Sequence, residues 1–439
     1  MTGQDPHQDL AAFWMPFTDN RGFKAHPRLL SSAKDMHYFT PDGRKVLDGT
    51  SGMWCVNAGH GRAPITEAIQ HSAANLDFAP TFQLGHPLAF QFANRLADML
   101  PDSLDRIFFT GSGSEAVDSA LKIALAYHKA AGQSERTRFI GRERGYHGVG
   151  FGGISVGGIP NNKRAFEPLL QTVDHIRTTY DPNVAFSRGQ PPQDGKFADD
   201  LERVIAEHGA DTIAAVIIEP VAGSAGVLVP PKGYLEKLRA ITKQHGILLI
   251  FDEVITGCGR LGAFTGAQAL GITPDIITLA KGITNGAVPM GAVAADRRIY
   301  DTILANAPPG IEFFHGHTYS GHPLAAAAGL ATLQVYEDED LFGRAATFAP
   351  QWQEAVHSLQ DAPHVIDIRN LGLMAGIELE SRADAPAARA REVFHACFDD
   401  GLLIRATGDI IALSPPLIVS SHHIDEIISR LKDTLKRVD

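Results

Sequence analysis

Two short apolar runs, each ending in a charged side chain, constrain this chain more than any other feature. The runs are Gly246–Phe251, followed at once by Asp252, and Pro274–Ala280, followed at once by Lys281. Short runs rich in β-branched residues are typical of central strands in a parallel sheet, which is buried on both faces. Ligands of such sheets bind just beyond the carboxyl ends of the strands. The sequence therefore predicts that a carboxylate and an amine meet at one edge of a sheet.

A carboxylate and an amine at that edge are the two groups that a pyridoxal phosphate enzyme requires. The amine forms a Schiff base with the cofactor aldehyde, and the acid partners the pyridinium nitrogen. An isolated aspartate or lysine after a strand is more often an ordinary loop charge. The hypothesis therefore depends on what the rest of the chain contains.

Alternating strand-like and helix-like segments predict an α/β fold. Strand-like runs at 106–110 and 214–218, together with the two runs above, alternate with helical periodicity, which indicates βαβ units around a largely parallel sheet. A chain of 439 residues is also expected to divide into domains. We expect a large domain over residues 61–325. A smaller α+β domain is expected from both chain ends, residues 1–60 and 326–439.

Composition argues against several kinds of partner. The net charge is -11 and no basic run is present, which disfavours nucleic acid. The three cysteines, Cys55, Cys258 and Cys397, lie far apart and fit a reducing compartment. The polar N-terminus lacks the layout of a signal peptide, and no apolar stretch approaches membrane-spanning length. We expect a cytoplasmic protein that binds neither nucleic acid nor membranes.

A glycine-rich turn at Gly111–Glu115 predicts a phosphate site. It follows the strand-like run 106–110 and precedes a helical pattern, and Ser112 and Glu115 have the spacing of a capping box. Glycines let the backbone approach an anion closely, and a helix N-terminus offers free N–H groups. A phosphate therefore fits at Gly113 and Ser114, although a merely well-capped helix explains this segment equally well. No Walker loop is present here.

Three nearby motifs suggest other chemistry. Gly148–Gly153 matches the dinucleotide fingerprint G-x-G-x-x-G, and Gly153–Gly157 matches the hydrolase elbow G-x-S-x-G. Neither follows a clear strand, and the segment from Ile154 to Pro160 is not expected to be a helix. His315, His317 and His322 lack the carboxylate or cysteine that would complete a metal site. All three interpretations are disfavoured.

Several motifs resemble those of one family, the class III (fold type I) pyridoxal-phosphate-dependent aminotransferases. They are Gly111–Ala116, Tyr146–Gly148, Glu219–Pro220, Asp252–Gly257, Gly259–Arg260 and His317–Pro323. Three longer stretches resemble the β-alanine:pyruvate (ω-amino acid:pyruvate) transaminase branch. They are Phe13–Thr18, Gly52–Gly61, and Ala280–Gly286 with Val288–Gly291. Two positions depart from the family pattern, since Cys258 replaces a usual aromatic and Leu261 replaces a common threonine.

The resemblance implies a role for each site residue. Lys281 would bind the cofactor covalently and act as acid and base, and Asp252 would keep the pyridine nitrogen protonated. The other cofactor-binding residues would be Gly113 and Ser114 at the phosphate, Tyr146 and Val254 on the two ring faces, Glu219 near the ring hydroxyl side, and Thr318 from the partner subunit at the phosphate. The substrate pocket would contain Phe17, Trp54 and Phe82 as apolar lining and Arg405 as a mobile carboxylate binder.

The implied reaction is transamination from an ω-amino acid or primary amine, such as β-alanine, to pyruvate. It would give alanine and an aldehyde or ketone. Other class III activities remain alternatives at this point, namely a 2-oxoglutarate-dependent aminotransferase, an aminomutase or a decarboxylase. The resemblance also implies a homodimer with shared active sites, either alone or paired into a tetramer.

Overall fold

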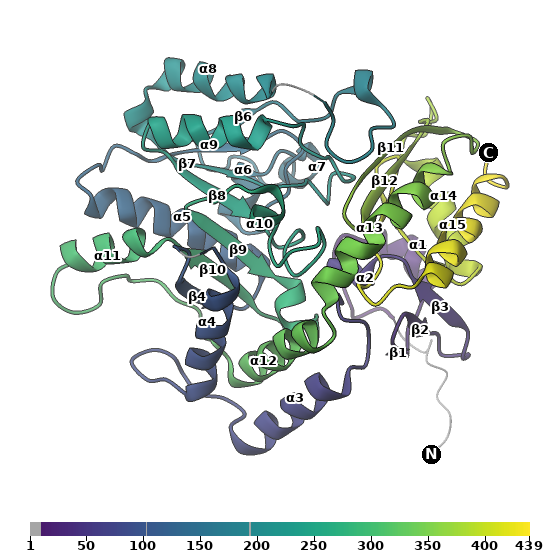
Figure 1. Cartoon of the computed structure of the whole chain (residues 1–439), viewed down its shortest axis with the longest axis horizontal. Helices are drawn as coiled ribbons and strands as arrows, with labels where there is room; N and C mark the ends of the chain where they lie inside the picture. Colours follow the sequence, from purple (N-terminus) through teal and green to yellow (C-terminus); the bar gives the residue numbers. More distant parts are fainter. Residues whose placement is uncertain (1–9, 102, 193–194) are drawn as a thin grey trace.

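The computed structural model describes residues 10–101, 103–192 and 195–439. Within these residues, seven strands form a central sheet (Figure 1). In order across the sheet they are β4 (Arg106–Thr110), β10 (Gly291–Ala295), β9 (Ile276–Ala280), β8 (Leu248–Asp252), β7 (Ile213–Ile218), β5 (Arg138–Arg142) and β6 (Val173–Ile176). Only β10 runs against its neighbours, so the expected mostly parallel sheet is confirmed.

Helices cover both faces of this sheet. Side chains of β8 alternate between the two faces: Leu248 and Ile250 belong to one apolar cluster, and Leu249 and Phe251 to the other. On the first face lie α5 (Gly113–Ala130) and α11 (Arg297–Asn306); on the second lie α4 (Pro87–Met99), α8 (Asp199–His208) and α9 (Tyr234–Gln244). Burial on both faces explains why the central strands β7, β8 and β9 are almost continuously apolar.

Shorter or flanking helices complete this part of the chain. They are α3 (Ala63–Asn75), α6 (Phe151–Val156), α7 (Pro160–Lys163), α10 (Gly266–Leu270) and α12 (Pro323–Asp338), with 3₁₀ turns η1 (Pro182–Val184), η2 (Lys196–Ala198), η3 (Ala210–Thr212) and η4 (Lys281–Thr284). The long α12 packs against α3 and α4. It also contacts η4, the turn that follows β9.

Two smaller sheets are built from the two ends of the chain. One contains β1 (Ser32–Lys34), β2 (His37–Phe39), β3 (Lys45–Asp48) and β13 (Leu402–Leu403); the other contains β11 (Val365–Leu371), β12 (Met374–Leu379), β15 (Ile410–Leu413) and β14 (Arg405–Thr407). The helices of these ends are α1 (Asn20–Ala25), α2 (Ser51–Trp54), α13 (Leu341–His357), α14 (Ala388–Asp399) and α15 (Ser421–Leu435).

Pairing between β3 and β13 joins segments that are far apart in sequence. The two strands run parallel, with Leu402 opposite Leu47, and Figure 1 shows β1–β3 beside α14 and α15 at the right of the view. On this basis we propose that residues 1–60 and 326–439 form one domain and residues 61–325 the other. The polar N-terminal stretch, residues 1–9, lies outside the described residues. In the described part of the chain, every helix is too short or too polar to cross a bilayer.

The central core makes a direct prediction for stability. Leu249 is fully buried on β8, so Leu249→Ala removes apolar contacts and leaves a cavity. We expect a loss of about 2–5 kcal/mol in the free energy of unfolding, measured in urea. Leu304→Ala on α11 is the control, since Leu304 is 38% exposed and should lose about 0.5 kcal/mol or less. Equal losses in the two variants would contradict this placement of the core.

Candidate active site

Asp252 ends β8 with its carboxylate buried and held from three sides. One oxygen, Oδ1, accepts from the Thr278 hydroxyl at 3.1 Å and from the backbone N–H of Val254 at 3.2 Å. The other oxygen, Oδ2, lies 2.8 Å from Nδ1 of His147. Thr278 belongs to the neighbouring strand β9 and is the residue paired with Asp252 in the sheet. The strand pairing therefore also fixes the direction of this carboxylate.

His147 is a site residue that the sequence analysis did not assign. It lies within the quoted motif Tyr146–Gly148, which was the signal that could have identified it. Its side chain is buried, and its second ring nitrogen, Nε2, has no hydrogen-bond partner in the described ranges of the chain. A histidine bonded to Asp252 holds the carboxylate's orientation and satisfies one of its acceptors.

Lys281 follows β9 at the same edge of the sheet. Its backbone is left-handed, with φ of 52°, which is unusual for a residue with a side chain. Burial lowers the pKa of the Lys281 ammonium, although Cys55, Asp252 and Glu219 act in the opposite direction. Within the described part of the chain, its amine makes no hydrogen bond or ion pair. The structure thus brings the predicted amine and acid together, with the amine free to react.

The glycine-rich turn begins α5 as expected, with one difference. Ser112 caps the helix by accepting from the N–H of Glu115 at 3.2 Å. In a capping box the Glu115 side chain would accept from the N–H of Ser112. Its carboxylate instead accepts from the N–H of Gly111 at 2.6 Å, so this part of the prediction is wrong. An added Cβ on Gly111 would lie 3.0 Å from that carboxylate, and glycine leaves room for it.

Gly113 forms part of a cradle beside the Lys281 strand. A Cβ added there would lie 3.1 Å from both methyl groups of Val254 and 3.4 Å from Cβ of Ala280. Ser114 accepts from the N–H of Val149 at 3.1 Å through its hydroxyl. The N-terminus of α5 therefore lies next to the carboxyl ends of β8 and β9. The first N–H groups of a helix have no partner within the helix, and the helix dipole favours an anion at this end.

Tyr146 and Glu219 occupy the next part of the site. One oxygen of the Glu219 carboxylate accepts from the N–H of Tyr146 at 2.9 Å, and the other accepts from the N–H of Gly223 at 3.1 Å. Burial raises the pKa of Glu219, and the nearby Asp252 charge raises it further. Burial also raises the pKa of the Tyr146 phenol, and the nearby Arg405 charge opposes this rise. These groups therefore lie close enough to influence one another electrostatically.

Arg405 begins β14 and lines a cavity of about 1360 Å³. Phe17, Gly52 and Met53 line the same cavity. Burial lowers the pKa of Arg405, and its buried Nε atom has no hydrogen-bond partner within the described part of the chain. A half-buried guanidinium with an unused donor is a ready binding group for a carboxylate.

The other two predicted pocket residues, Trp54 and Phe82, are not among the residues that line this cavity. Trp54 is only 2% exposed and packs in an apolar cluster with Val227, Ile255 and Met374, so its ring is not among the cavity-lining residues. Phe82 is 58% exposed and lies against Gly316.

Thr318 is also exposed, two residues after Gly316. The loops that carry Phe82 and Thr318 are joined by a 2.9 Å hydrogen bond from the Thr81 hydroxyl to the carbonyl of Ser320. Phe82 and Thr318 thus share an exposed face and do not reach the cavity of their own chain.

The residues of the three alternative motifs make other contacts in the structure. No group of three or more potential metal ligands occurs among the described residues. His315 and His317 instead lie 2.8 and 3.3 Å from the Ser119 hydroxyl. The expectation of no helix between 154 and 160 is wrong, because α6 spans Phe151–Val156. Its glycines pack tightly on α5, where Gly153 donates to the Asp118 carboxylate at 2.8 Å.

Together these residues fit the expected cofactor. The half-buried amine of Lys281 has no hydrogen-bond partner among the described residues, a buried carboxylate lies at the adjacent strand end, and a glycine cradle at the start of α5 suits a phosphate. A pyridoxal phosphate ring needs these three groups around it. The donor set therefore supports the cofactor on chemical grounds.

Comparison with known proteins agrees with this site. The family described as Aminotransferase class-III matches residues 20–435. An omega-aminotransferase of Caulobacter vibrioides is 64% identical over 432 residues, covering 98% of both chains. A beta-alanine–pyruvate aminotransferase of Pseudomonas aeruginosa is 46% identical, covering 98% of this chain and 96% of the relative.

A solved structure extends the comparison to the fold. It is an amine transaminase from an uncultivated Pseudomonas species in its PLP-bound form. This neighbour has a TM-score of 0.89 and 37% identity, covering 98% of this chain and 99% of its own. The match extends over nearly the whole of both chains, and the sheet carries Asp252 and Lys281 as the sequence predicts. This chain belongs to the class III aminotransferase family.

Proposed function

We propose that this protein transfers an amino group from an ω-amino acid or primary amine, such as β-alanine, to pyruvate, with pyridoxal 5′-phosphate as cofactor. The observation that carries this proposal is Arg405, a half-buried guanidinium whose Nε is unused among the described residues, which lines the cavity of about 1360 Å³ and lies close to Tyr146. The name of the Pseudomonas aeruginosa relative, beta-alanine–pyruvate aminotransferase, supports the same donor and acceptor, and the name of the Caulobacter relative, omega-aminotransferase, supports the class of donor.

When bound, pyridoxal phosphate supplies an aldehyde that links covalently to amines and a ring that accepts electrons. Lys281 would hold the aldehyde, and Asp252 would hold the proton on the ring nitrogen. The remaining contacts would come from Gly113 and Ser114 at the phosphate, Tyr146 and Val254 at the ring faces, and Glu219 near the ring hydroxyl.

The environment of Lys281 suits a proton carrier. Its Nζ must be neutral to take a proton from the substrate carbon, and burial lowers the pKa of this group from its usual value. The lysine is therefore a better base near neutral pH than an exposed lysine would be. His147 and Thr278 keep the Asp252 carboxylate oriented, because the Thr278 hydroxyl donates to one oxygen and Nδ1 of His147 lies 2.8 Å from the other.

Arg405 accounts for the acceptance of two unlike substrates. A guanidinium binds carboxylates in a bidentate manner, which suits both pyruvate and β-alanine. Phe17 lines the same cavity and would contact the apolar part of a larger amine. Gly52 and Met53 also line the cavity, and Trp54, which follows them in the chain, would support them by packing in the apolar cluster behind.

We further propose a homodimer with shared active sites, alone or paired into a tetramer. Thr318 and Phe82 lie on an exposed face of this chain, so both would serve the site of the partner subunit. Large apolar side chains are also exposed around them: Phe78, Leu84, Phe90, Phe314 and Tyr319. Exposed apolar surface of this kind favours burial against another chain. We propose the cytoplasm as the compartment, since the three cysteines are free.

The role of Lys281 is tested by Lys281→Ala. We expect the loss of more than about 10⁴-fold in turnover of β-alanine and pyruvate to alanine, because the covalent and proton-transfer roles both disappear. The thermal unfolding midpoint should stay close to that of the native protein. Lys129→Ala, at the far end of α5, is the control and should retain full activity. Comparable turnover in Lys281→Ala would disprove the assignment.

The role of Arg405 is tested by Arg405→Ala. We expect the KM values for pyruvate and β-alanine to rise about 10- to 100-fold, as hydrogen bonds to charged groups contribute about 1.5–3 kcal/mol. The KM for 1-phenylethylamine should change little, since it has no carboxylate. Arg203→Ala, on the exposed surface of α8, serves as the control. Equal rises for all three substrates would remove Arg405 from this role.

A further inference from the structure

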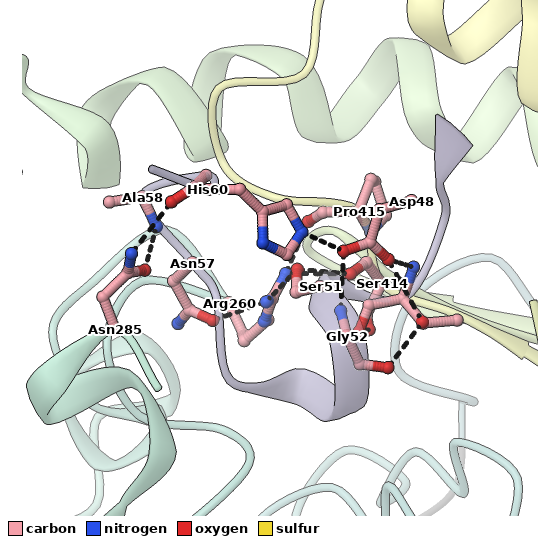
Figure 2. A network of polar contacts seen from close by, with 12 residues as sticks. Asp48, Ser51, Gly52, Asn57, Ala58, His60, Arg260, Asn285, Ser414 and Pro415 are labelled. Carbon is pink, nitrogen blue, oxygen red and sulfur yellow. Dashed lines mark hydrogen bonds and ion pairs between the residues drawn. The ribbon is translucent and has the colours of Figure 1, made fainter. Parts of the chain in front are cut away.

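A buried polar network joins one wall of the cavity that Arg405 lines to the turn that carries Lys281 (Figure 2). The wall is the segment Ser51–Trp54, which forms α2 and whose Gly52 and Met53 line the cavity. Its backbone is strained, because Ser51 and Trp54 have φ values of 48° and 62°. Left-handed residues with side chains persist only where their surroundings hold them in place.

Asp48 holds the backbone at the start of this wall. It is fully buried, and its Oδ1 accepts from the N–H of Thr50 at 2.9 Å. Its Oδ2 accepts from the N–H of Gly52 at 2.7 Å and also lies 2.8 Å from Nε2 of His60. One carboxylate thus holds two backbone N–H groups, one just before the strained segment and one within it.

Arg260 holds the same wall from the other side. It is also fully buried, and it donates to the Ser51 hydroxyl at 2.5 Å and to the carbonyl of Pro415 at 2.6 Å. The Ser51 hydroxyl in turn donates to the carbonyl of Ser414 at 2.8 Å. Burial lowers the pKa of Arg260 to about 10, so the guanidinium remains charged at neutral pH.

The network continues from Arg260 to the lysine turn. Arg260 also donates to the side-chain oxygen of Asn57. The next residue, Ala58, donates its N–H to the side chain of Asn285 at 2.8 Å, and Asn285 donates back to the carbonyl of Gly59 at 2.9 Å. Asn285 ends the turn η4 that begins at Lys281.

The lysine turn is itself strained and held. Lys281 and Asn285 are both left-handed, with φ values of 52° and 51°. The buried Tyr336 hydroxyl donates to the carbonyl of Gly282 at 2.7 Å, which ties the turn to α12. Two strained segments, one on the cavity wall and one bearing the reactive amine, are therefore linked through a single set of hydrogen bonds.

We propose that Asp48 and Arg260 are positioning residues that hold the cavity wall at Gly52 and Met53 in a fixed relation to the Lys281 turn, and that this relation sets the size of amine accepted. This inference deepens the proposed function and rests on it for the identity of the substrates. The linkage between the two segments is a property of the chain itself. It is therefore measurable without turnover.

Hydrogen–deuterium exchange of the cofactor-free protein tests the linkage. Asp48→Asn keeps the shape of the side chain and removes one charged acceptor. We expect faster exchange in peptides covering residues 49–56 and also in those covering residues 281–287, which Asp48 does not contact. Faster exchange at 49–56 alone would overturn the linkage, as would unchanged exchange in both.

Asp275→Asn is a matched control for this experiment. Asp275 is another buried aspartate that accepts from a backbone N–H, that of Leu249 at 2.8 Å, and it pairs with Arg239 at 2.6 Å. It precedes β9, at the end opposite to Lys281. We expect it to loosen that end only. Faster exchange at residues 281–287 in this control would show that any buried aspartate has the same effect, and would overturn the proposal.

Substrate size selection tests the functional part. We expect Asp48→Asn to change the ratio of kcat/KM values for 1-phenylethylamine and β-alanine, each with pyruvate, by at least 5-fold, and Asp275→Asn to leave it within 2-fold. Ser51→Ala is a milder variant that decides the question if Asp48→Asn does not fold, with an expected change of about 3-fold in the same direction. Equal loss for both donors in these variants would overturn the role in size selection. Absence of turnover in the native protein would instead refute the proposed function, and the exchange experiment would still report on the linkage.

Discussion

The parallel pairing of β8 with β9 is the constraint on which the site depends. Asp252 is paired with Thr278 in this register, and Lys281 follows the last residue of β9, so acid and amine emerge at one edge of the sheet. Parallel strands lie about 4.8 Å apart, which is close to the width of an aromatic ring. A one-residue slip would turn Asp252 to the opposite face and separate it from Thr278 and His147. The chemistry of the site is thus a consequence of sheet register.

Buried charge is the second theme of the structure. The site collects Asp252, Glu219, Lys281 and Arg405, and burial shifts the pKa of the last three toward the uncharged form. Asp252 and Glu219 are compensated by hydrogen bonds from neighbouring groups, whereas the amine of Lys281 and Nε of Arg405 have no hydrogen-bond partner among the residues that the structure describes. Unsatisfied buried groups cost stability and are retained where they bind or react. The two unpaired groups are those to which the proposed function assigns the cofactor and the substrate carboxylate.

Local pattern was enough to predict the strands, the start of α5 and the placement of Asp252 and Lys281, because each depends on neighbours in sequence. The role of His147 was missed, since its bond to Asp252 spans 105 residues. The contact between Tyr336 and the Gly282 carbonyl was likewise invisible, as no periodicity reports a single bond between α12 and η4. The ring of Trp54 packs in an apolar cluster and its backbone is left-handed, with φ of 62°, and the sequence pattern predicts neither feature; its place at the substrate pocket stays a prediction. Side-chain direction at such strained positions follows from tertiary contacts, which sequence periodicity does not encode.

The covalent link between cofactor and lysine is the central claim, and borohydride trapping tests it most directly. The protein loaded with pyridoxal phosphate is treated with sodium borohydride, digested, and analysed by mass spectrometry. We predict one reduced adduct, on the peptide containing Lys281, which disappears when an amine donor is added before the borohydride. A trapped adduct on any other lysine, or none at all, would contradict the account.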